Sequence, residues 1–188
     1  MASRRLRGVL LCEDQEHEDF FRPLLKKWFG KGKLRVDKIP NREGAGDAYV
    51  VANYPKLVQL ARSKRFENYA LIVAIDGDRD KLHRRLQRLD RALEDAGFDV
   101  RGDDDPIVLF VPTRNIETWE LWLCGLRDID EETDFKRRFQ EAKARRKVSA
   151  KEAAKAWNKP LSEQERKLEE KTLPALAAGR LEIRRLNG

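Results

Sequence analysis

Cysteine and histidine are scarce in this chain, with two of each among 188 residues. Cys12 and Cys124 stand far apart, each within an apolar stretch, and the sequence has no CxxC pair and no Cys/His cluster. The ligand spacing of a structural zinc site is therefore missing. Both cysteines are expected to be buried free thiols.

Long hydrophobic runs are missing as well. The first residues, MASRRLRGVLLCEDQ, hold arginines followed by a short apolar run. This run is too short for the core of a signal peptide and far too short to cross a bilayer, so it predicts a strand. We therefore expect a cytoplasmic protein without a membrane partner.

Charged residues, by contrast, make up 39% of the chain, well above the quarter or so of typical soluble domains. The net charge is +7 and the isoelectric point is near 9.5. A basic surface favours nucleic acid or another polyanion, because binding releases counterions. A solubilising surface rich in arginine explains the same numbers, and charge alone does not separate the two. The sequence is also compatible with an oligomer.

Four short apolar runs predict strands. The third and fourth are continuous, as in strands that are buried on both faces of a parallel sheet. The runs are Gly8–Cys12, Leu34–Ile39, Ala70–Ile75 and Ile107–Val111.

Helical patterns separate these strands. The first helix has an apolar face that continues to Trp28, and Gly30 and Gly32 are expected to end it. The second covers roughly residues 48–63, with Pro55 at a kink or near a start. The third carries a leucine stripe and ends at Gly97. This alternation predicts an α/β fold with a small, mainly parallel four-stranded sheet flanked by helices.

The composition changes after Pro112. A short apolar helix is expected over Glu117–Leu123, and from Asp130 onward the sequence is polar and helical. We therefore expect an α/β domain over residues 1–128 and a basic helical extension over residues 129–188. The extension could be a helical subdomain, a lid or a mobile arm.

Acidic residues follow two of the predicted strands. Glu13 comes directly after the first strand, and Asp76 and Asp78 come directly after the third. Ligands bind at the carboxyl edge of an open parallel sheet, and carboxylate oxygens suit Mg²⁺ or Mn²⁺. A helix N-cap at Glu13 and an ordinary Asp-Gly-Asp turn are the alternatives.

These two motifs resemble those of the Toprim domain, which topoisomerases, primases, OLD-family nucleases and related ribonucleases share. LLCEDQEHEDFF is similar to the first Toprim motif, and LIVAIDGDRD is similar to the DxD motif. The resemblance covers roughly residues 8–111 and implies a Toprim/Rossmann-like fold with a Mg²⁺-dependent phosphotransfer centre. It implies that Asp76 and Asp78 bind metal and that Glu13 binds metal or acts as a general acid or base.

The chain departs from the Toprim pattern just after Glu13. Many Toprim proteins have glycine at the next position, where this chain has Asp14. OLD-like nucleases often carry an acid where this chain has His17, so the second metal position stays open. His17 is expected to bind metal or accept a proton, with a surface histidine paired to a nearby acid as the alternative.

A further acid is expected near the fourth strand. In VPTRNIETWELW, Asn115 is expected to cap a helix whose first turn holds Glu117. Glu117 is either an additional catalytic acid or a residue that stabilises the helix dipole beside Trp119. This segment resembles small Toprim-like proteins that are associated with ATPase partners in phage-defence gene pairs.

Basic residues accompany the acids. Those expected to contact a nucleic-acid backbone are Arg79, Arg84, Arg85 and Arg114. Arg84 and Arg85 lie on the third helix, opposite its leucine stripe, where a merely solvated face is the alternative.

The sequence supports two main functional hypotheses. The first is a Toprim-type nuclease that hydrolyses phosphodiester bonds in nucleic acid, with DNA favoured over RNA, as the effector of an ATPase-associated phage-defence system. The second is a non-catalytic Toprim-like interaction subunit of an ATPase complex. A phosphatase-like enzyme with Asp76 as nucleophile is a third option. The nuclease would use Mg²⁺ or Mn²⁺, with metal ligands Glu13, Asp76, Asp78 and His17 and catalytic residues Glu13, Asp76, Asp78 and Glu117.

Overall fold

The computed structural model describes residues 6–38, 46–77 and 82–187. Four strands form one sheet in the order β2-β1-β3-β4, and every neighbouring pair is parallel. The expected α/β class with a small parallel sheet is therefore confirmed. The strands are β1 (Leu6–Cys12), β2 (Phe29–Lys38), β3 (Tyr69–Ala74) and β4 (Ile107–Phe110).

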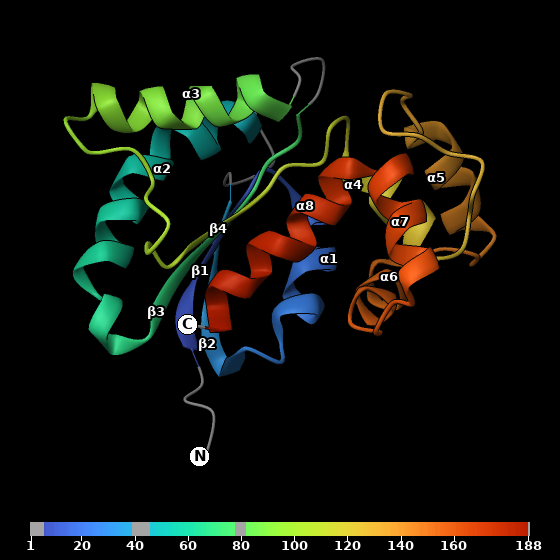
Figure 1. Ribbon diagram of the computed structural model, residues 1–188, viewed down its shortest axis with the longest axis horizontal. Helices are drawn as coiled ribbons and strands as arrows, with labels where there is room; N and C mark the ends of the chain where they lie inside the picture. Colours follow the sequence, from blue (N-terminus) through green and yellow to red (C-terminus); the bar gives the residue numbers. More distant parts are fainter. Residues whose placement is uncertain (1–5, 39–45, 78–81, 188) are drawn as a thin grey trace.

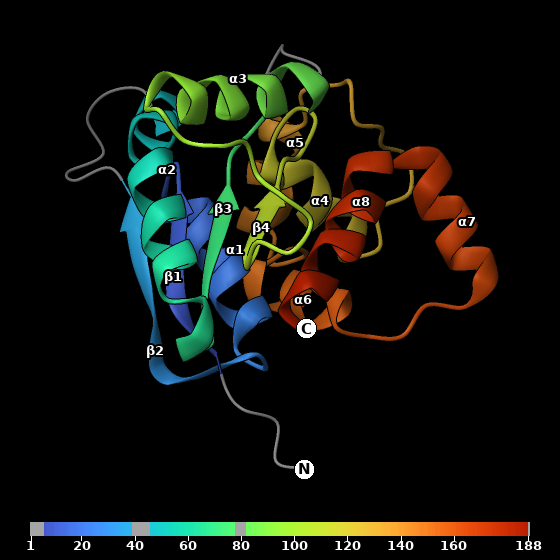
Figure 2. The same cartoon turned by 60° about the vertical axis from the view of Figure 1, so that its left-hand side comes forward.

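Helices cover both faces of the sheet (Figure 1, Figure 2). On one face lie α2 (Gly46–Ser63) and α3 (Leu82–Asp95). The other face is covered by α1 (Gln15–Leu25), α4 (Ile116–Leu123), α6 (Ala150–Trp157) and α8 (Pro174–Glu182). Two more helices, α5 (Lys136–Ala144) and α7 (Glu163–Thr172), lie outside this layer, and a 3-10 helix, Ile183–Asn187, follows α8.

The strand side chains divide between two cores because successive residues of a strand point to opposite faces. Val9 and Leu71 belong to the core under α2 and α3. Leu10, Ile72 and Phe110 belong to the core under α1, α4, α6 and α8. Strands β1, β3 and β4 are therefore buried on both faces, as the continuous apolar runs of β3 and β4 predict, whereas the edge strand β2 is mostly half-buried or exposed.

The chain reverses direction across the sheet between β1 and β3. It leaves β1 through α1 to β2 at one edge, then returns over the opposite face through α2 to β3. Neighbouring strands whose connections leave in opposite directions form a topological switch point, and a crevice opens at their carboxyl ends. That crevice is the place where this fold is expected to bind a ligand.

The C-terminal helices share a core with the α/β layer. The Trp157 ring lies 6.2 Å from Phe20, 5.9 Å from Phe110 and 5.8 Å from Trp119, measured between ring centroids. At Gly179 on α8, an added Cβ would lie 3.1 to 3.2 Å from three of these rings. Packing is therefore continuous across residue 128, where we expected one domain to end.

The segment between α1 and β2 differs from the sequence prediction. Helix α1 ends at Leu25, so Trp28 lies beyond it, and Gly30 and Gly32 belong to β2 rather than to a helix end. The β1–β2 register shifts here, from Leu6 opposite Phe29 to Gly8 opposite Leu34. The extra residues of β2 form a bulge, in which Gly32 adopts a φ of +69°.

Other local predictions are confirmed or refined. Gly97 has a φ of +76° just after α3, as a C-terminal glycine should. Pro55 lies inside α2, not near its start. Cys12 is buried and Cys124 half-buried, and both are free thiols. No helix within the described ranges is long and apolar enough to cross a membrane.

Substitution of Gly8 tests the close approach of β1 to β3. A Cβ at this position would stand 2.1 Å from the carbonyl oxygen of Ala70. Because that oxygen belongs to the backbone of a central strand, the strands must separate to make room. We expect Gly8→Ala to lower the free energy of unfolding by about 1–3 kcal/mol or more, measured by urea denaturation.

Gly102→Ala is the matched control for Gly8→Ala. The nearest atom to an added Cβ at Gly102 is Asp105 Oδ2, at 3.9 Å. This change should alter the unfolding free energy by less than about 0.5 kcal/mol. Equal losses in the two variants would contradict the proposed close contact of the strands.

Candidate functional site

The ends of β1 and β3 are joined through two of the predicted acids. Glu13 Oε1 accepts a hydrogen bond of 3.0 Å from the backbone N–H of Asp76. Asp76 is only 4% exposed, whereas Glu13 is half-buried. Both residues lie at the switch point between β1 and β3, and they meet through the Glu13 carboxylate and the Asp76 backbone.

Two glycines allow the backbone to close around these acids. A Cβ at Gly77 would lie 2.4 Å from the carbonyl oxygen of Thr113, and the Gly77 N–H donates to the Pro112 carbonyl at 2.7 Å. A Cβ at Gly46, the first residue of α2, would lie 2.9 Å from both Cβ and O of Glu13. The start of α2 therefore packs directly against Glu13.

Helix N-termini surround this edge of the sheet. Helix α1 starts just after Asp14, whose side chain accepts from the His17 N–H. Helix α4 starts after Asn115, which caps it by accepting from Thr118, as the sequence predicts. Since helix N-termini carry partial positive charge, they favour anions such as carboxylates or phosphates at this edge.

His17 connects Asp14 to Asp76. Its Nδ1 lies 2.8 Å from Asp14 Oδ1, and its Nε2 lies 3.1 Å from Asp76 Oδ1. The ring is completely buried. In this arrangement both ring nitrogens have carboxylate partners, so the expected metal ligation by His17 would require the ring to leave Asp76.

The charges of Asp14, His17 and Asp76 stabilise one another. Burial alone would lower the pKa of His17, but the carboxylates of Asp76 and Asp14 raise it well above its usual range. Burial opposes ionisation of Asp14, and its hydrogen bonds and charge contact with His17 more than offset this, lowering the Asp14 pKa. An imidazolium between two carboxylates accounts for both shifts.

Glu117 lies in the first turn of α4 and is buried. The pKa of Glu117 is raised to about 7, chiefly by burial and also by the charge of Asp76, although its own backbone N–H, Lys136 and His17 act in the opposite direction. Among the described residues, Glu117 Oε2 has no hydrogen-bond partner. A fourth acid is therefore present close to Asp76, where the sequence places it.

Glu120 is a buried acid that the sequence analysis missed. It is 0% exposed, and neither carboxylate oxygen has a hydrogen-bond partner within the described ranges. Burial raises its pKa to about 9, and the charges of Glu16 and Glu117 act in the same direction. The available signal was its position one helical turn after Glu117, within an otherwise apolar helix.

The arginines predicted to contact nucleic acid differ in their exposure and in their acidic partners. Arg85 is 2% exposed, and its Nη1 lies 3.1 Å from Asp47 Oδ2 on α2, so this geometry does not offer it to a phosphate. Arg88 binds the same oxygen at 2.6 Å. Arg84 is exposed, as expected. Arg114 lies 3.8 Å from Asp134.

Two predicted site residues, Asp78 and Arg79, lie outside the described residues. Within the described part of the chain, no three His, Cys, Asp or Glu side chains gather closely enough to hold a metal ion. The oxygen donors of Glu13, Asp76 and Glu117 have the chemistry that Mg²⁺ or Mn²⁺ requires. The residues present therefore fit such an ion in kind, with Asp78 as the additional ligand that the DxD motif predicts.

A hollow of about 590 Å³ opens beside this edge. Leu82 and Leu86 of α3 line one part of it, and Lys171 and Pro174 line another. Thr113, the residue that Gly77 closely approaches, also lines the hollow, which places it next to the end of β3. None of Glu13, Asp76 and Glu117 is among the residues described as lining the hollow, so it lies next to the sheet edge without including these acids.

Comparison of the chain with models of known protein families, with curated proteins and with solved structures gives no match. The Toprim resemblance therefore depends on the sequence motifs alone.

Glu120→Gln tests the burial of an acid in α4 through the pH dependence of stability. The Glu120 carboxyl has a pKa near 4.5 in the unfolded chain and about 9 in the folded protein. Between these pH values only the folded state keeps the proton. Stability from this group is complete below 4.5 and is lost as the pH rises through about 9. We expect Glu120→Gln to flatten this decline and to add roughly 1–3 kcal/mol of stability at the higher pH.

Urea unfolding at several pH values between these limits measures the effect. Glu94→Gln, at an exposed position of α3, is the control and should leave the pH profile unchanged. If Glu120→Gln and wild type lose stability in parallel as the pH rises, Glu120 does not ionise within the fold as described.

Proposed function

We propose that this protein is a Toprim-type nuclease that hydrolyses phosphodiester bonds in nucleic acid, DNA rather than RNA, with Mg²⁺ or Mn²⁺. The observation that supports the proposal is the Glu13 carboxylate bonded to the Asp76 backbone at the β1–β3 switch point. Open parallel sheets bind their ligands at such a point. The basic character of the chain suits a polyanionic substrate.

In this proposal Glu13, Asp76 and Asp78 hold the ion. Mg²⁺ or Mn²⁺, when bound, would polarise the scissile phosphate and stabilise the leaving oxygen. Glu13 is oriented by the Asp76 N–H, and this fixes the spacing of the two strand ends. Glu117 would take or give a proton beside Asp76 in this proposal.

His17 and Asp14 act as positioning residues in this account. The ring of His17 holds one oxygen of Asp76 at 3.1 Å, and Asp14 holds the ring from the other side at 2.8 Å. Partners of this kind orient ligand carboxylates and tune their charge. His17 is thus assigned to Asp76 rather than directly to the ion.

The substrate strand would approach through the hollow beside Thr113. Lys171 lines that hollow, Arg84 is exposed on α3, and the N-termini of α1, α2 and α4 favour the phosphate. On the basis of the resemblance alone, we place this nuclease as the effector of an ATPase-associated phage-defence system.

A second candidate function is a non-catalytic interaction subunit of an ATPase complex. The contact of His17 with Asp76 favours it, because the protein itself already satisfies one oxygen of the central acid. Under this second proposal, the wild-type protein shows no saturable Mn²⁺ binding by isothermal titration calorimetry.

Asp76→Asn tests the nuclease proposal. We expect wild type to nick supercoiled plasmid DNA in the presence of Mn²⁺, and the variant to lose more than the roughly 10–100-fold typical of losing a partner of a metal ligand. The amide keeps the size of the side chain but removes the charge that attracts the cation. Gel analysis of nicked and linear plasmid measures the rate.

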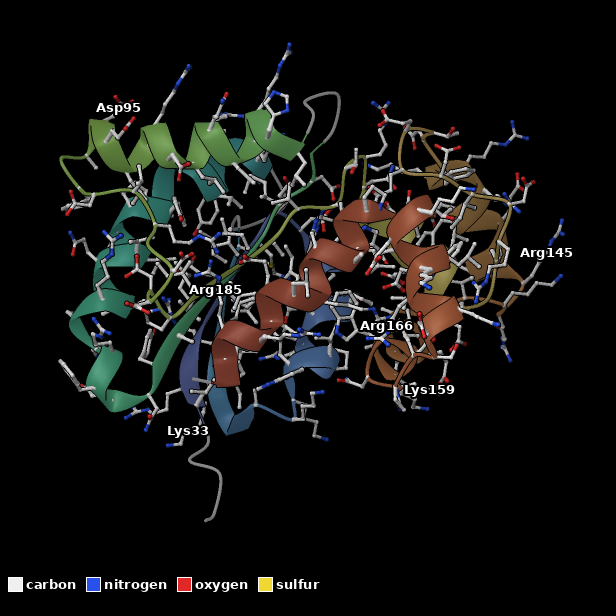
Figure 3. All side chains as sticks on the ribbon, viewed as in Figure 1. Lys33, Asp95, Arg145, Lys159, Arg166 and Arg185 are labelled. Carbon is white, nitrogen blue, oxygen red and sulfur yellow. The ribbon has the colours of Figure 1, made fainter. Side chains whose placement is uncertain are left out.

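Asp95→Asn is the control for this assay. Asp95 is exposed at the far end of α3, away from the sheet edge (Figure 3), and its substitution should leave nicking unchanged. Circular dichroism establishes that Asp76→Asn is folded. Wild type that is inert with every divalent ion, or a folded Asp76→Asn as active as wild type, would contradict the nuclease proposal.

A further inference from the structure

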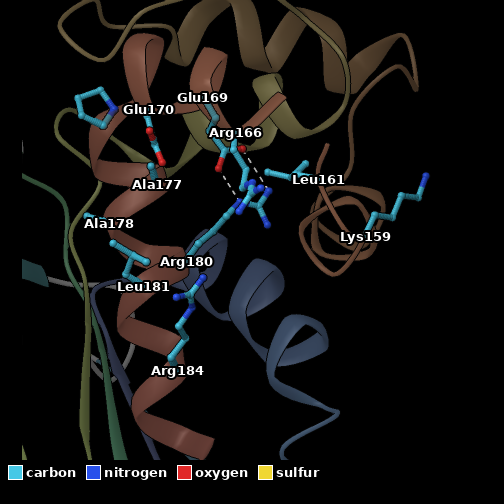
Figure 4. A pocket seen from close by; sticks show the side chains of 11 residues that line it. Lys159, Leu161, Arg166, Glu169, Glu170, Ala177, Ala178, Arg180, Leu181 and Arg184 are labelled. Atoms are coloured by element: carbon cyan, nitrogen blue, oxygen red, sulfur yellow. Dashed lines mark hydrogen bonds and ion pairs between the residues drawn. The ribbon is translucent and has the colours of Figure 1, made fainter. Parts of the chain in front are cut away.

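A second hollow lies between the C-terminal helices. It has a volume of about 600 Å³ and is lined by α7, α8 and the segment that joins α6 to α7 (Figure 4). This volume is within the usual range of ligand pockets. None of the acids at the sheet edge lines it, so it is separate from the candidate metal site.

One part of the pocket wall is apolar. Leu161 and Leu181 stand on either side of the hollow, and Ala177 and Ala178 of α8 lie along it (Figure 4). Leu181 is 57% exposed, which makes it one of the few large apolar side chains that the described chain leaves in water. Because alanine side chains are short, they leave room for an inserted apolar group.

The arginines that line the pocket differ in their ion pairs and exposure. Arg180 donates to both carboxylate oxygens of Glu169 and to the Trp157 carbonyl, and its guanidinium stacks 4.7 Å from the Trp157 ring. It therefore forms part of the wall. Arg166 and Arg184 make no ion pair with any other described residue, and both are exposed.

This chemistry favours a peptide over a nucleic acid. The residues described as lining the pocket include no aromatic side chain, whereas single-stranded nucleic acids bind by stacking bases on aromatic rings. The free cations are long exposed side chains around an apolar wall, and they do not fix one polar geometry for a small molecule. The exposed cations of the lining, Lys159, Arg166 and Arg184, outnumber its exposed carboxylate, Glu170, so acidic side chains on both sides of an apolar residue match the pocket in charge.

We propose that the pocket between α7 and α8 binds an acidic peptide segment of a partner protein. The segment inserts one leucine-sized side chain between Leu161 and Leu181, and its carboxylates pair with Arg166 and Arg184. The peptide site does not depend on metal or on nuclease activity, so it stands or falls separately from the proposed function.

Fluorescence anisotropy tests this site with a defined probe. The probe is a short fluorescein-labelled peptide with one central leucine flanked on both sides by glutamates, titrated with the full chain. We expect saturable binding that weakens roughly tenfold in Leu181→Asp and in Arg166→Glu. Wild type should bind a probe with serine in place of the leucine no more tightly than the Leu181→Asp variant binds the leucine probe.

Two matched variants separate the pocket from the general basic surface. Leu168→Asp changes an exposed leucine that lies on α7 and does not line the pocket. Arg145→Glu reverses a charge that projects into solvent at the end of α5 (Figure 3). Both should bind the probe like wild type, and Asp76→Asn should do so too.

The proposal is overturned if wild type does not bind the probe, or if the serine probe binds equally well. It is also overturned if the Leu168 and Arg145 variants weaken binding as much as the pocket variants do. Displacement of the probe by single-stranded DNA, with the same variants losing DNA affinity, would assign the pocket to nucleic acid instead.

Discussion

The hydrogen bond from the Asp76 N–H to the Glu13 carboxylate holds together the carboxyl ends of β1 and β3. It is possible because the two strands run in register and approach closely at Gly8. Gly46 lets α2 begin against Glu13, and at Gly77 the absence of a side chain lets the backbone lie against the Thr113 carbonyl. Any larger residue at these glycines would push apart the groups on which the proposed chemistry depends.

Much of the fold can be predicted from the sequence because β1, β3 and β4 contain short, continuous apolar runs that are separated by helical patterns. The cap at Asn115 can be predicted as well, because a short polar side chain directly before an apolar helix commonly accepts a hydrogen bond from the first turn of that helix. The end of α1 is not readable. Trp28 fits the helical period of its apolar face, and only the pairing of Phe29 with Leu6 shows that the strand has already begun.

The site is readable in part. Carboxyl ends of parallel strands converge, so the nearness of Glu13 and Asp76 follows from their positions. The burial of Glu120 does not, because it depends on α5 and α6 packing beside α4, far along the chain. Arg85 likewise has the spacing of a solvated face, and the carboxylate of Asp47 on a separate helix draws it inward.

The account depends on a divalent cation shared by Glu13 and Asp76. The most direct measurement is anomalous diffraction from crystals of the protein soaked in Mn²⁺. The account predicts a peak at roughly 2.0–2.4 Å from carboxylate oxygens of both residues. Crystals that hold Mn²⁺ only elsewhere, or none at saturating concentration, with His17 still bound to Asp76, would contradict it.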